Sequence, residues 1–232
     1  MVGLAINVGA NTTLPGFRGP IDRHGSFVYV PIPERKPTRV PVPTYRDLDL
    51  SIEIDTTHRE TPVHLDPTFA SYPCCADYTY GDEHGVKAGP ISTLDADDYL
   101  FFYATLETED TDPPDWMPPR WGAYLIGHHR LAEPPVIDAH ERGLTPEERE
   151  RFSENAHVKR EIMDARVLVR GDPAESALYE RAIPLSASTG GGTPGSLVTD
   201  HSTDSGRGPW WRRPLRFPDV SPVLAARNRR NR

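Results

Sequence analysis

The segment Phe152–Arg160 gathers side chains that can bind or react with a nucleotide. It contains Asn155, His157, Lys159 and Arg160 within a few residues. An amide can pair with a base edge, an imidazole can transfer a proton, and cations can hold phosphate. The alternative is a solvated connection between a helix and a strand. We treat His157 as a candidate catalytic group and the other three residues as candidate nucleotide-binding groups.

Two loops that precede this segment add carboxylates and aromatic rings. The sequence HLDP contains Asp66, and the sequence TYGD contains Tyr80 and Asp82. Asp66 and Asp82 could act as general acid or base, and Tyr80 and Tyr103 could stack on a base. Asp-Pro and Gly-Asp are also ordinary turn dipeptides, and a Tyr within an apolar strand commonly belongs to the core. Both interpretations stay open.

The first polar loop of the chain supplies two further candidate nucleotide-binding residues, Asn11 and Arg18. Arg18 precedes a Gly-Pro pair and could contact an anion. The loop lacks the Lys and the Gly spacing of a phosphate-binding P-loop. We therefore interpret Arg18 as a single anion contact.

Metal and covalent chemistry have weak support in the sequence. His64 and the pair His128–His129 invite a metal hypothesis, but neighbouring strand residues point to opposite faces, so the pair cannot easily converge on one ion. The zinc deaminase pattern, the Gly-x-Ser-x-Gly elbow and the dinucleotide fingerprint are all missing. Cys74 and Cys75 have no cationic neighbour in sequence to stabilise a thiolate. We expect no metal site, and the sequence identifies no cofactor.

Apolar runs predict the elements that position these residues. Strands are expected at residues 2–8, 26–33, 99–106, 121–131, 164–170 and 177–185, with 99–106 and 121–131 paired antiparallel. Thr145, followed by Pro146 and two Glu, predicts the start of a helix. With 25 Pro and 18 Gly, long helices are disfavoured. The pattern predicts an α+β domain around a mainly antiparallel sheet, and a barrel-like closure stays open.

Composition divides the chain into three regions. Residues 1–186 are expected to form the α+β domain, and the Ser/Thr/Gly-rich residues 187–208 to be flexible. Residues 209–232 form a Trp/Arg-rich tail. This tail could bind nucleic acid by charge and stacking, or it could be a disordered, solubilising extension.

Charge restricts how the chain could bind nucleic acid. The formal net charge is -8, and the last 26 residues hold eight Arg and one Asp, which leaves -15 for residues 1–206. Because nucleic-acid binding usually relies on a positive surface, any phosphate contact must be local. The acidic balance is compatible with a salt-adapted cytoplasm.

The sequence also bears on location. The two adjacent Cys give no disulfide framework, and the amino end lacks the pattern of a signal peptide. No stretch approaches the roughly 20 apolar residues that span a bilayer. We expect a cytoplasmic protein with no membrane partner.

Several motifs occur in a characteristic order: GFRGPI and SFVYVPIP within residues 16–33, HLDP and TYGD within 64–82, and NAH and ERAIP within 155–184. In this order they resemble the third type of nucleotide modification associated domain, over about residues 2–186. The resemblance implies a link to DNA base modification, with a nucleotide or nucleic acid, including modified DNA, as partner. The family normally has an acidic residue near the position of Asn11, so an acid-dependent role there is in doubt.

A looser similarity suggests a different class of function. Residues 97–103 and 122–127 are similar to the strand pair of PUA, ASCH and EVE-like small barrels, which read RNA or modified bases. The alternative to a modifying protein is therefore a non-catalytic reader, and a third alternative is an interaction domain. A catalyst should place His157 within hydrogen-bond reach of a carboxylate such as Asp66 or Asp82, whereas a reader should show an aromatic cage. Whether the chain is an enzyme stays open.

Overall fold

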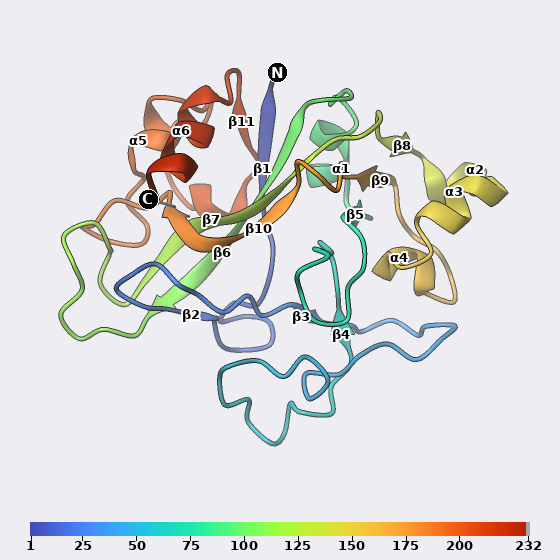
Figure 1. Ribbon diagram of the computed structural model, residues 1–232, viewed down its shortest axis with the longest axis horizontal. Helices are drawn as coiled ribbons and strands as arrows, with labels where there is room; N and C mark the ends of the chain where they lie inside the picture. Colours follow the sequence, from blue (N-terminus) through green and yellow to red (C-terminus); the bar gives the residue numbers. More distant parts are fainter. Residues whose placement is uncertain (231–232) are drawn as a thin grey trace. The chain divides into compact units, whose positions relative to one another are not determined.

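The apolar run near the start of the chain forms strand β1 (Gly3–Asn7) in the computed structural model, which describes residues 1–230 (Figure 1). β1 pairs in parallel with β6 (Tyr99–Thr108) and antiparallel with β11 (Leu215–Phe217). Leu4 faces Leu100 in the first pairing and Arg216 in the second. The strand predicted at residues 2–8 is confirmed, and it is central because both of its edges are paired.

The chain divides into two compact units. Unit 1 comprises residues 1–30, 98–128 and 178–232, and unit 2 comprises residues 31–97 and 129–177. Each unit is therefore built from segments that are distant in sequence. The boundaries predicted from composition, at residues 186 and 208, do not coincide with the boundaries of the units.

A six-stranded sheet forms the framework of unit 1. Its order is β10-β7-β6-β1-β11, and β2 (Pro20–Ile21) also pairs with β6. β7 spans Trp121–Arg130 and β10 spans Ala177–Pro184. The N–H of Thr108 donates to the carbonyl of Arg120, which joins the end of β6 to the start of β7. The predicted antiparallel pairing of these strands is confirmed, and no sheet within residues 1–230 closes into a barrel.

The core of unit 1 explains why its strands are almost continuously apolar. The first eight residues of β6 are buried, as are the eight inner residues of β7. Strands that are covered on both faces lack the alternation of apolar and polar residues that marks a half-exposed strand. Fully buried side chains from β1, β6 and β7 include Leu4, Ile6, Phe101, Phe102, Tyr124 and Leu125.

The C-terminal region belongs to unit 1. It contains α5 (Ser196–Thr199), the 3-10 helix η1 (Trp210–Arg212), β11 and α6 (Ser221–Arg230), seen in orange and red in Figure 1. Trp210 is fully buried, and its indole N–H donates to the carbonyl of Gly192 over 2.9 Å. The guanidinium of Arg230 lies over the ring of Trp116 at 3.6 Å from the centroid. Part of the arginine-rich segment therefore packs on unit 1, and Arg232 lies outside the described residues.

The helices are short throughout. α6, the longest in residues 1–230, has ten residues, and none of the helices in this range is both long and apolar enough to cross a bilayer.

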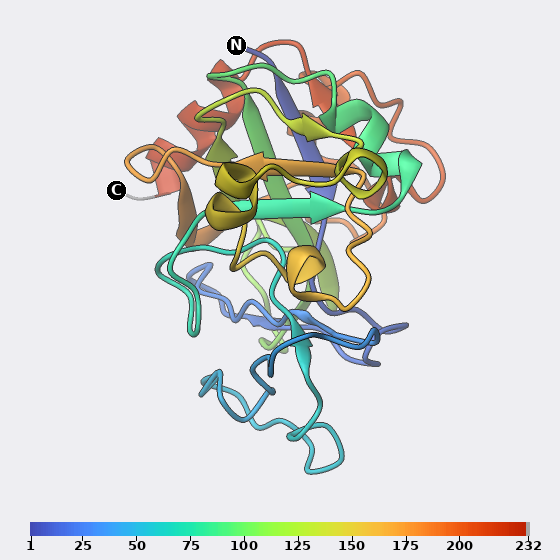
Figure 2. The same cartoon turned by 90° about the vertical axis from the view of Figure 1, so that its right-hand side faces the viewer.

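Unit 2 is built on two small sheets. β5 (Thr79–Asp82) pairs antiparallel with β9 (Val167–Arg170), and β9 pairs with β8 (Val136–Ile137). A separate pair joins β3 (Ile32–Pro33) to β4 (Val63–His64). Figure 2 shows β5 in turquoise beside β9 in orange, with α4 next to β5. β9 confirms part of the strand predicted at residues 164–170.

Four short helices accompany these sheets: α1 (Gly85–Ile91), α2 (Ala139–Arg142), α3 (Pro146–Arg151) and α4 (Ala156–Lys159). The helix start predicted at Thr145 is confirmed. The Thr145 hydroxyl accepts from the N–H of Glu148, and the Glu148 carboxylate accepts from the N–H of Thr145, which completes a capping box.

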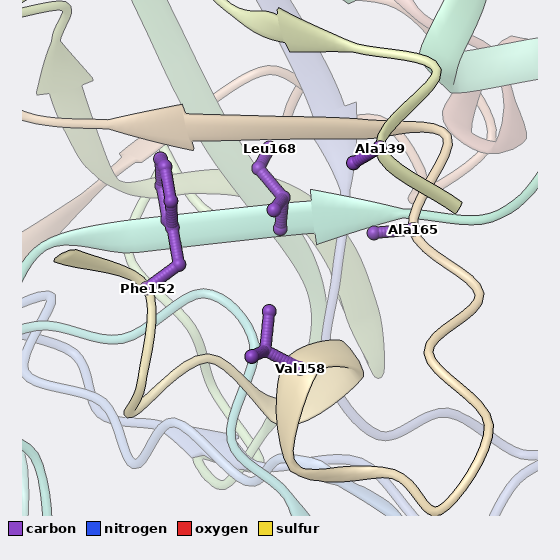
Figure 3. Packing of buried hydrophobic residues seen from close by; sticks show 5 residues of the cluster. All are labelled: Ala139, Phe152, Val158, Ala165 and Leu168. Carbon is purple, nitrogen blue, oxygen red and sulfur yellow. The ribbon is translucent and has the colours of Figure 1, made fainter. Parts of the chain in front are cut away.

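The helices of unit 2 enclose a small apolar core beside β9. Its buried members are Ala139, Phe152, Val158, Ala165 and Leu168. Figure 3 shows Val158 on α4 below β5 and Leu168 extending from β9 above β5. Burial of Val158 orients α4, so the opposite side of this helix can carry polar groups.

The strand predicted at residues 26–33 is wrong for most of its length. Only Ile32–Pro33 forms a strand, and Phe27 makes an isolated bridge to Ile21. Pro31 and Pro33 have no N–H to donate, which prevents a regular ladder over this run. The Pro-rich residues 34–62 form turns and irregular segments.

Candidate functional site

The segment Phe152–Arg160 contains the helix α4 and is therefore more than a solvated connection between a helix and a strand. Asn155 caps α4: its side-chain oxygen accepts from the N–H of His157 over 3.0 Å. The side-chain nitrogen of Asn155 donates to the hydroxyl of Thr79 over 3.3 Å. Asn155 is fully buried. Asn155 joins α4 to β5, and its role in nucleotide binding stays a prediction.

His157 lies between two carboxylates. Its Nδ1 is 2.7 Å from Oδ1 of Asp164, and its Nε2 is 3.6 Å from Oδ2 of Asp66. Only 4% of the residue is exposed. Asp164 is a carboxylate within hydrogen-bond distance of His157, and sequence reasoning did not name it.

His64 on β4 repeats this arrangement toward the same oxygen of Asp66. Its Nδ1 is 2.7 Å from Oε2 of Glu34, and its Nε2 is 4.0 Å from Oδ2 of Asp66. The rings of His64 and His157 are nearly perpendicular, with centroids 4.9 Å apart. We call Glu34, His64, Asp66, His157 and Asp164 the histidine–carboxylate cluster.

The hydrogen bonds fix the chemistry that the two imidazoles can perform. Each Nδ1 lies 2.7 Å from a carboxylate oxygen, which only accepts hydrogen bonds, and farther from a guanidinium nitrogen of Arg160, at 3.0 Å for His157 and 3.3 Å for His64. The shorter distance to the carboxylate favours a proton on Nδ1 that is donated to Glu34 or Asp164. In a ring with this tautomer, the lone pair is on Nε2. Both Nε2 atoms face Asp66, so two bases and one carboxylate converge on the same small volume.

Asp66 is held in place by the backbone of β5. Its Oδ2 accepts from the N–H of Gly81 over 2.8 Å, whereas its Oδ1 is buried without a hydrogen-bond partner. Burial raises the pKa of Asp66 well above its ordinary value. A Cβ atom on residue 81 would lie 2.9 Å from the ring of His157, so the close approach requires glycine.

Arg160 is enclosed by acidic side chains. Its guanidinium donates to Glu34 over 3.1 Å, to Asp164 over 2.7 Å and to Glu83 over 3.3 Å. Lys36 also contacts both Asp164 and Glu83. Arg160 is buried and paired, so it orients the carboxylates that orient the histidines, and its role in nucleotide binding stays a prediction.

The cluster shifts the pKa values of its members in opposite directions. Burial opposes ionisation of Glu34, but hydrogen bonds and charge from His64 outweigh it and lower the pKa of Glu34 to about 2. Burial lowers the pKa of His64 to about 4, against the hydrogen bond to Glu34. Hydrogen bonds from His157 and its neighbours outweigh burial and lower the pKa of Asp164. At neutral pH His64 is therefore neutral, and both supporting carboxylates are ionised.

Three other predicted residues of unit 2 have local partners. The Tyr80 hydroxyl donates to Oδ2 of Asp82 over 2.9 Å, and Oδ1 of Asp82 accepts from the N–H of His84 over 2.7 Å. Lys159 donates to Glu154 over 2.7 Å. Asp82 was predicted as a partner for His157, but its hydrogen bonds are to Tyr80 and the backbone of His84.

The remaining predicted residues lie in unit 1. Asn11 and Arg18 both line a polar pocket, together with Asn7, Thr12, Thr13, Thr105, Trp211 and Arg212. The side-chain oxygen of Asn11 accepts from the N–H of Thr13 over 2.8 Å, so it also shapes its own loop. Tyr103 is fully buried, and its hydroxyl donates to the carbonyl of Arg213 over 2.7 Å. We correct its expected role as a stacking platform, because it fills the core.

Sequence reasoning missed Glu34 and Asp164 and left His64 out of the site. Glu34 follows a proline-terminated strand, and Asp164 comes only seven residues after His157, but nothing local marks either as a histidine partner. The pair His128–His129 has other contacts: His128 stacks on Tyr99, and Nε2 of His129 lies 3.0 Å from the carbonyl of Thr68. The useful signal was the short spacing of His64 and Asp66.

Comparison with known families shows to which family the chain belongs. A family model described as nucleotide modification associated domain 3 matches residues 3–229. The chain belongs to this family. Membership in the family supports a general role of this chain in nucleotide or DNA modification. The match continues past residue 186, so the C-terminal region that we expected to lie outside the resemblance is part of the matched span.

Two other comparisons give no match. A search of curated proteins found none, and a search of solved structures found none. The geometry of unit 2 must therefore be interpreted from its own residues.

Proposed function

We propose that this nucleotide modification associated protein modifies a nucleotide or a base of DNA at the histidine–carboxylate cluster of unit 2. The observation that carries the proposal is the convergence of Nε2 of His64 and Nε2 of His157 on Asp66, at 4.0 and 3.6 Å. Each imidazole is held by a second carboxylate. Buried, mutually oriented titratable groups of this kind are typical of reactive sites.

The cluster has the two properties that catalysis requires. It is preorganised, because Glu34 and Asp164 fix the rings of His64 and His157 through hydrogen bonds of 2.7 Å. It is also largely shielded from water, since His64, Asp66 and His157 are all buried. Charges and lone pairs act more strongly on a reacting group in such surroundings.

A modifying role is favoured over a reading role by the same geometry. A reader of modified bases needs aromatic faces around the base, whereas acid–base or Lewis-acid chemistry needs imidazoles beside carboxylates. His64 and His157 have the second type of surroundings. Asp164 is the hydrogen-bond partner of His157 that we expected Asp66 or Asp82 to be, and Glu34 is the corresponding partner of His64.

The polar pocket of unit 1 supplies a separate contact for nucleic acid in this proposal. Arg18 and Arg212 line it beside Trp211, which combines cationic groups with an aromatic ring. Local cations of this kind are what an acidic chain would need to hold phosphate.

Mass spectrometry of nucleosides tests the proposal. Total DNA and the nucleotide pool are compared between a strain with the protein, a strain without it, and strains carrying His157→Ala or His140→Gln. We expect the deletion and His157→Ala to change the profile in the same way, while His140→Gln matches the intact strain. An identical profile in all four strains would contradict a modifying function.

A further inference from the structure

We propose that His64, Asp66 and His157 form a binding site for one divalent transition-metal ion. The ligands would be the Nε2 atoms of the two histidines and a carboxylate oxygen of Asp66. One ligand atom from each residue can be chosen so that all three lie within 4.8 Å of one another. The metal site does not depend on the proposed substrate, because it follows from the arrangement of these side chains alone.

The distances suit a metal ion after a small contraction. Nε2 of His157 and Nε2 of His64 lie 3.6 and 4.0 Å from Oδ2 of Asp66. With bond lengths of about 2.1 Å, ligand atoms at tetrahedral angles stand about 3.4 Å apart. A direct N–H···O hydrogen bond would be shorter than either observed distance. The spacing therefore fits ligands that surround an ion better than side chains that bond to each other.

The second layer of hydrogen bonds is the one that metal-binding histidines require. Histidine ligands commonly donate their other ring N–H to a carboxylate, which fixes the tautomer and the ring orientation. Glu34 provides this acceptor for His64, and Asp164 provides it for His157, each over 2.7 Å. Two independent imidazoles with the same support, both aimed at one carboxylate, are difficult to explain by packing alone.

Asp66 gives a separate indication of a missing ligand. The residue is 6% exposed, and its Oδ1 has no hydrogen-bond partner. A buried carboxylate oxygen without a partner is costly, and native proteins rarely leave one unsatisfied. A cation bound through both carboxylate oxygens of Asp66 would remove this cost.

The charges around the site leave room for a dication. Arg160 forms ion pairs with Glu34, Glu83 and Asp164, and Lys36 forms ion pairs with Glu83 and Asp164. Four acidic side chains belong to this network: Glu34, Asp66, Glu83 and Asp164. They outnumber the two cations, Arg160 and Lys36, by two. One divalent ion would balance this excess.

A second possible set of ligands, Glu83, His157 and Asp164, is less suitable. Lys36 and Arg160 already pair with both Glu83 and Asp164. Binding there would also use Nδ1 of His157, which carries a proton in its hydrogen bond to Asp164. The site centred on Asp66 has neither conflict.

The ligand set indicates the class of metal. Two imidazoles and one carboxylate suit first-row transition ions, with Zn²⁺ and Fe²⁺ as the principal examples, and three protein ligands leave coordination positions open. Mg²⁺ and Ca²⁺ prefer sites made of oxygen ligands. We therefore expect Zn²⁺ or Fe²⁺ to bind and Mg²⁺ to bind far more weakly.

Metal titration of the full chain, without an affinity tag and after treatment with a chelator, tests the site. Titrations use Zn²⁺, Fe²⁺ under anaerobic conditions, and Mg²⁺. We expect one equivalent of Zn²⁺ or Fe²⁺ to bind. Asp66→Asn and the His64→Ala/His157→Ala pair should weaken that binding at least about tenfold, as should Glu34→Gln through loss of ring support. The control His140→Gln should leave it unchanged.

X-ray absorption at the metal edge keeps the test independent of variant folding. In the intact protein loaded with Zn²⁺, we expect two imidazole ligands together with oxygen ligands. Absence of stoichiometric binding, or a coordination shell without imidazole, would overturn the proposal. So would unchanged affinity in variants of Asp66 and His157 whose circular dichroism is that of the folded protein.

Discussion

Nε2 of His157 points at Oδ2 of Asp66 across 3.6 Å, while the opposite nitrogen of the same ring is hydrogen-bonded to Asp164. Nδ1 of the imidazole is thus held by Asp164, and Nε2 faces the interior of the site. The same division holds for His64 with Glu34 and Asp66. Because His157 lies on α4, the position of this helix determines the chemistry that we propose for the protein.

Asn155→Ala should destabilise unit 2. The change removes the cap of α4 and leaves the buried hydroxyl of Thr79 without one of its partners. We expect the free energy of unfolding to fall by about 2 kcal/mol, from the loss of an N-cap and of a buried hydrogen bond. Urea denaturation measures it. The exposed neighbour Ser153→Ala is the control, and equal stability of the two variants would contradict the structural role of Asn155.

Arg160→Met should cost more than Asn155→Ala. It leaves Glu34 and Asp164 without their buried guanidinium partner. Breaking a buried ion pair by removing one partner typically costs about 3–5 kcal/mol. Unfolding is followed in urea with a chelator present, against the exposed control Arg149→Met. A loss below about 1 kcal/mol would show that Arg160 is not a structural centre of the cluster.

Cys75 should be unreactive at neutral pH. Burial, followed by the neighbouring Cys74, raises the pKa of Cys75 to about 11. An acid with a raised pKa in the folded state stays protonated to a higher pH, and only the thiolate reacts with iodoacetamide. In a Cys74→Ser variant, the alkylation rate of Cys75 should rise about tenfold per pH unit between pH 8 and 10.

The same shift has a consequence for stability. Because the folded state holds this proton more tightly than the unfolded state, the contribution of Cys75 is present below its ordinary thiol pKa and is lost as the pH rises toward 11. The Cys75→Ser variant should not show this loss of stability as the pH rises toward 11. Rapid alkylation of folded Cys74→Ser at pH 7.5, at the rate of a free thiol, would contradict the burial of Cys75.

Arg18→Ala should weaken binding of nucleic acid without sequence preference. Arg18 lies in the unit 1 pocket with Arg212 and Trp211. Loss of one phosphate contact should reduce the slope of log K against log salt by about 1. Fluorescence anisotropy with a short single-stranded DNA measures the slope, with Arg149→Ala as control. The pocket would be excluded as a phosphate contact if Arg18→Ala and Arg149→Ala gave the same slope as the intact protein.

Local sequence rules were reliable where a local interaction decides the structure. The helix that begins after Thr145 depends on a capping box within four residues, and β6 depends on its own apolar run. The candidate site was only partly predictable for the opposite reason. Arg160 and Glu34 are 126 residues apart, and their pairing depends on how segments of unit 2 assemble. A sequence reveals that Glu34 and Asp164 are acidic but not that they face the two histidines.

The C-terminal region illustrates the same limit. Its Ser, Thr, Gly and Arg content resembles that of a flexible tail. β11 nevertheless completes one edge of the unit 1 sheet, because Leu215 and Phe217 are fully buried against it. Removal of residues 207–232, which would otherwise test binding by the arginine-rich segment, would therefore also remove a strand of unit 1, and point substitutions are more informative.

The most direct test of the central claim compares nucleosides from strains carrying Asp66→Asn and Asp77→Asn. Both changes replace a carboxylate by an amide, but Asp66 is buried beside two histidines and Asp77 is exposed. We predict that Asp66→Asn gives the nucleoside profile of the deletion strain, while the protein stays folded, and that Asp77→Asn gives the profile of the intact strain. A folded Asp66→Asn protein that restores the intact profile would contradict the account.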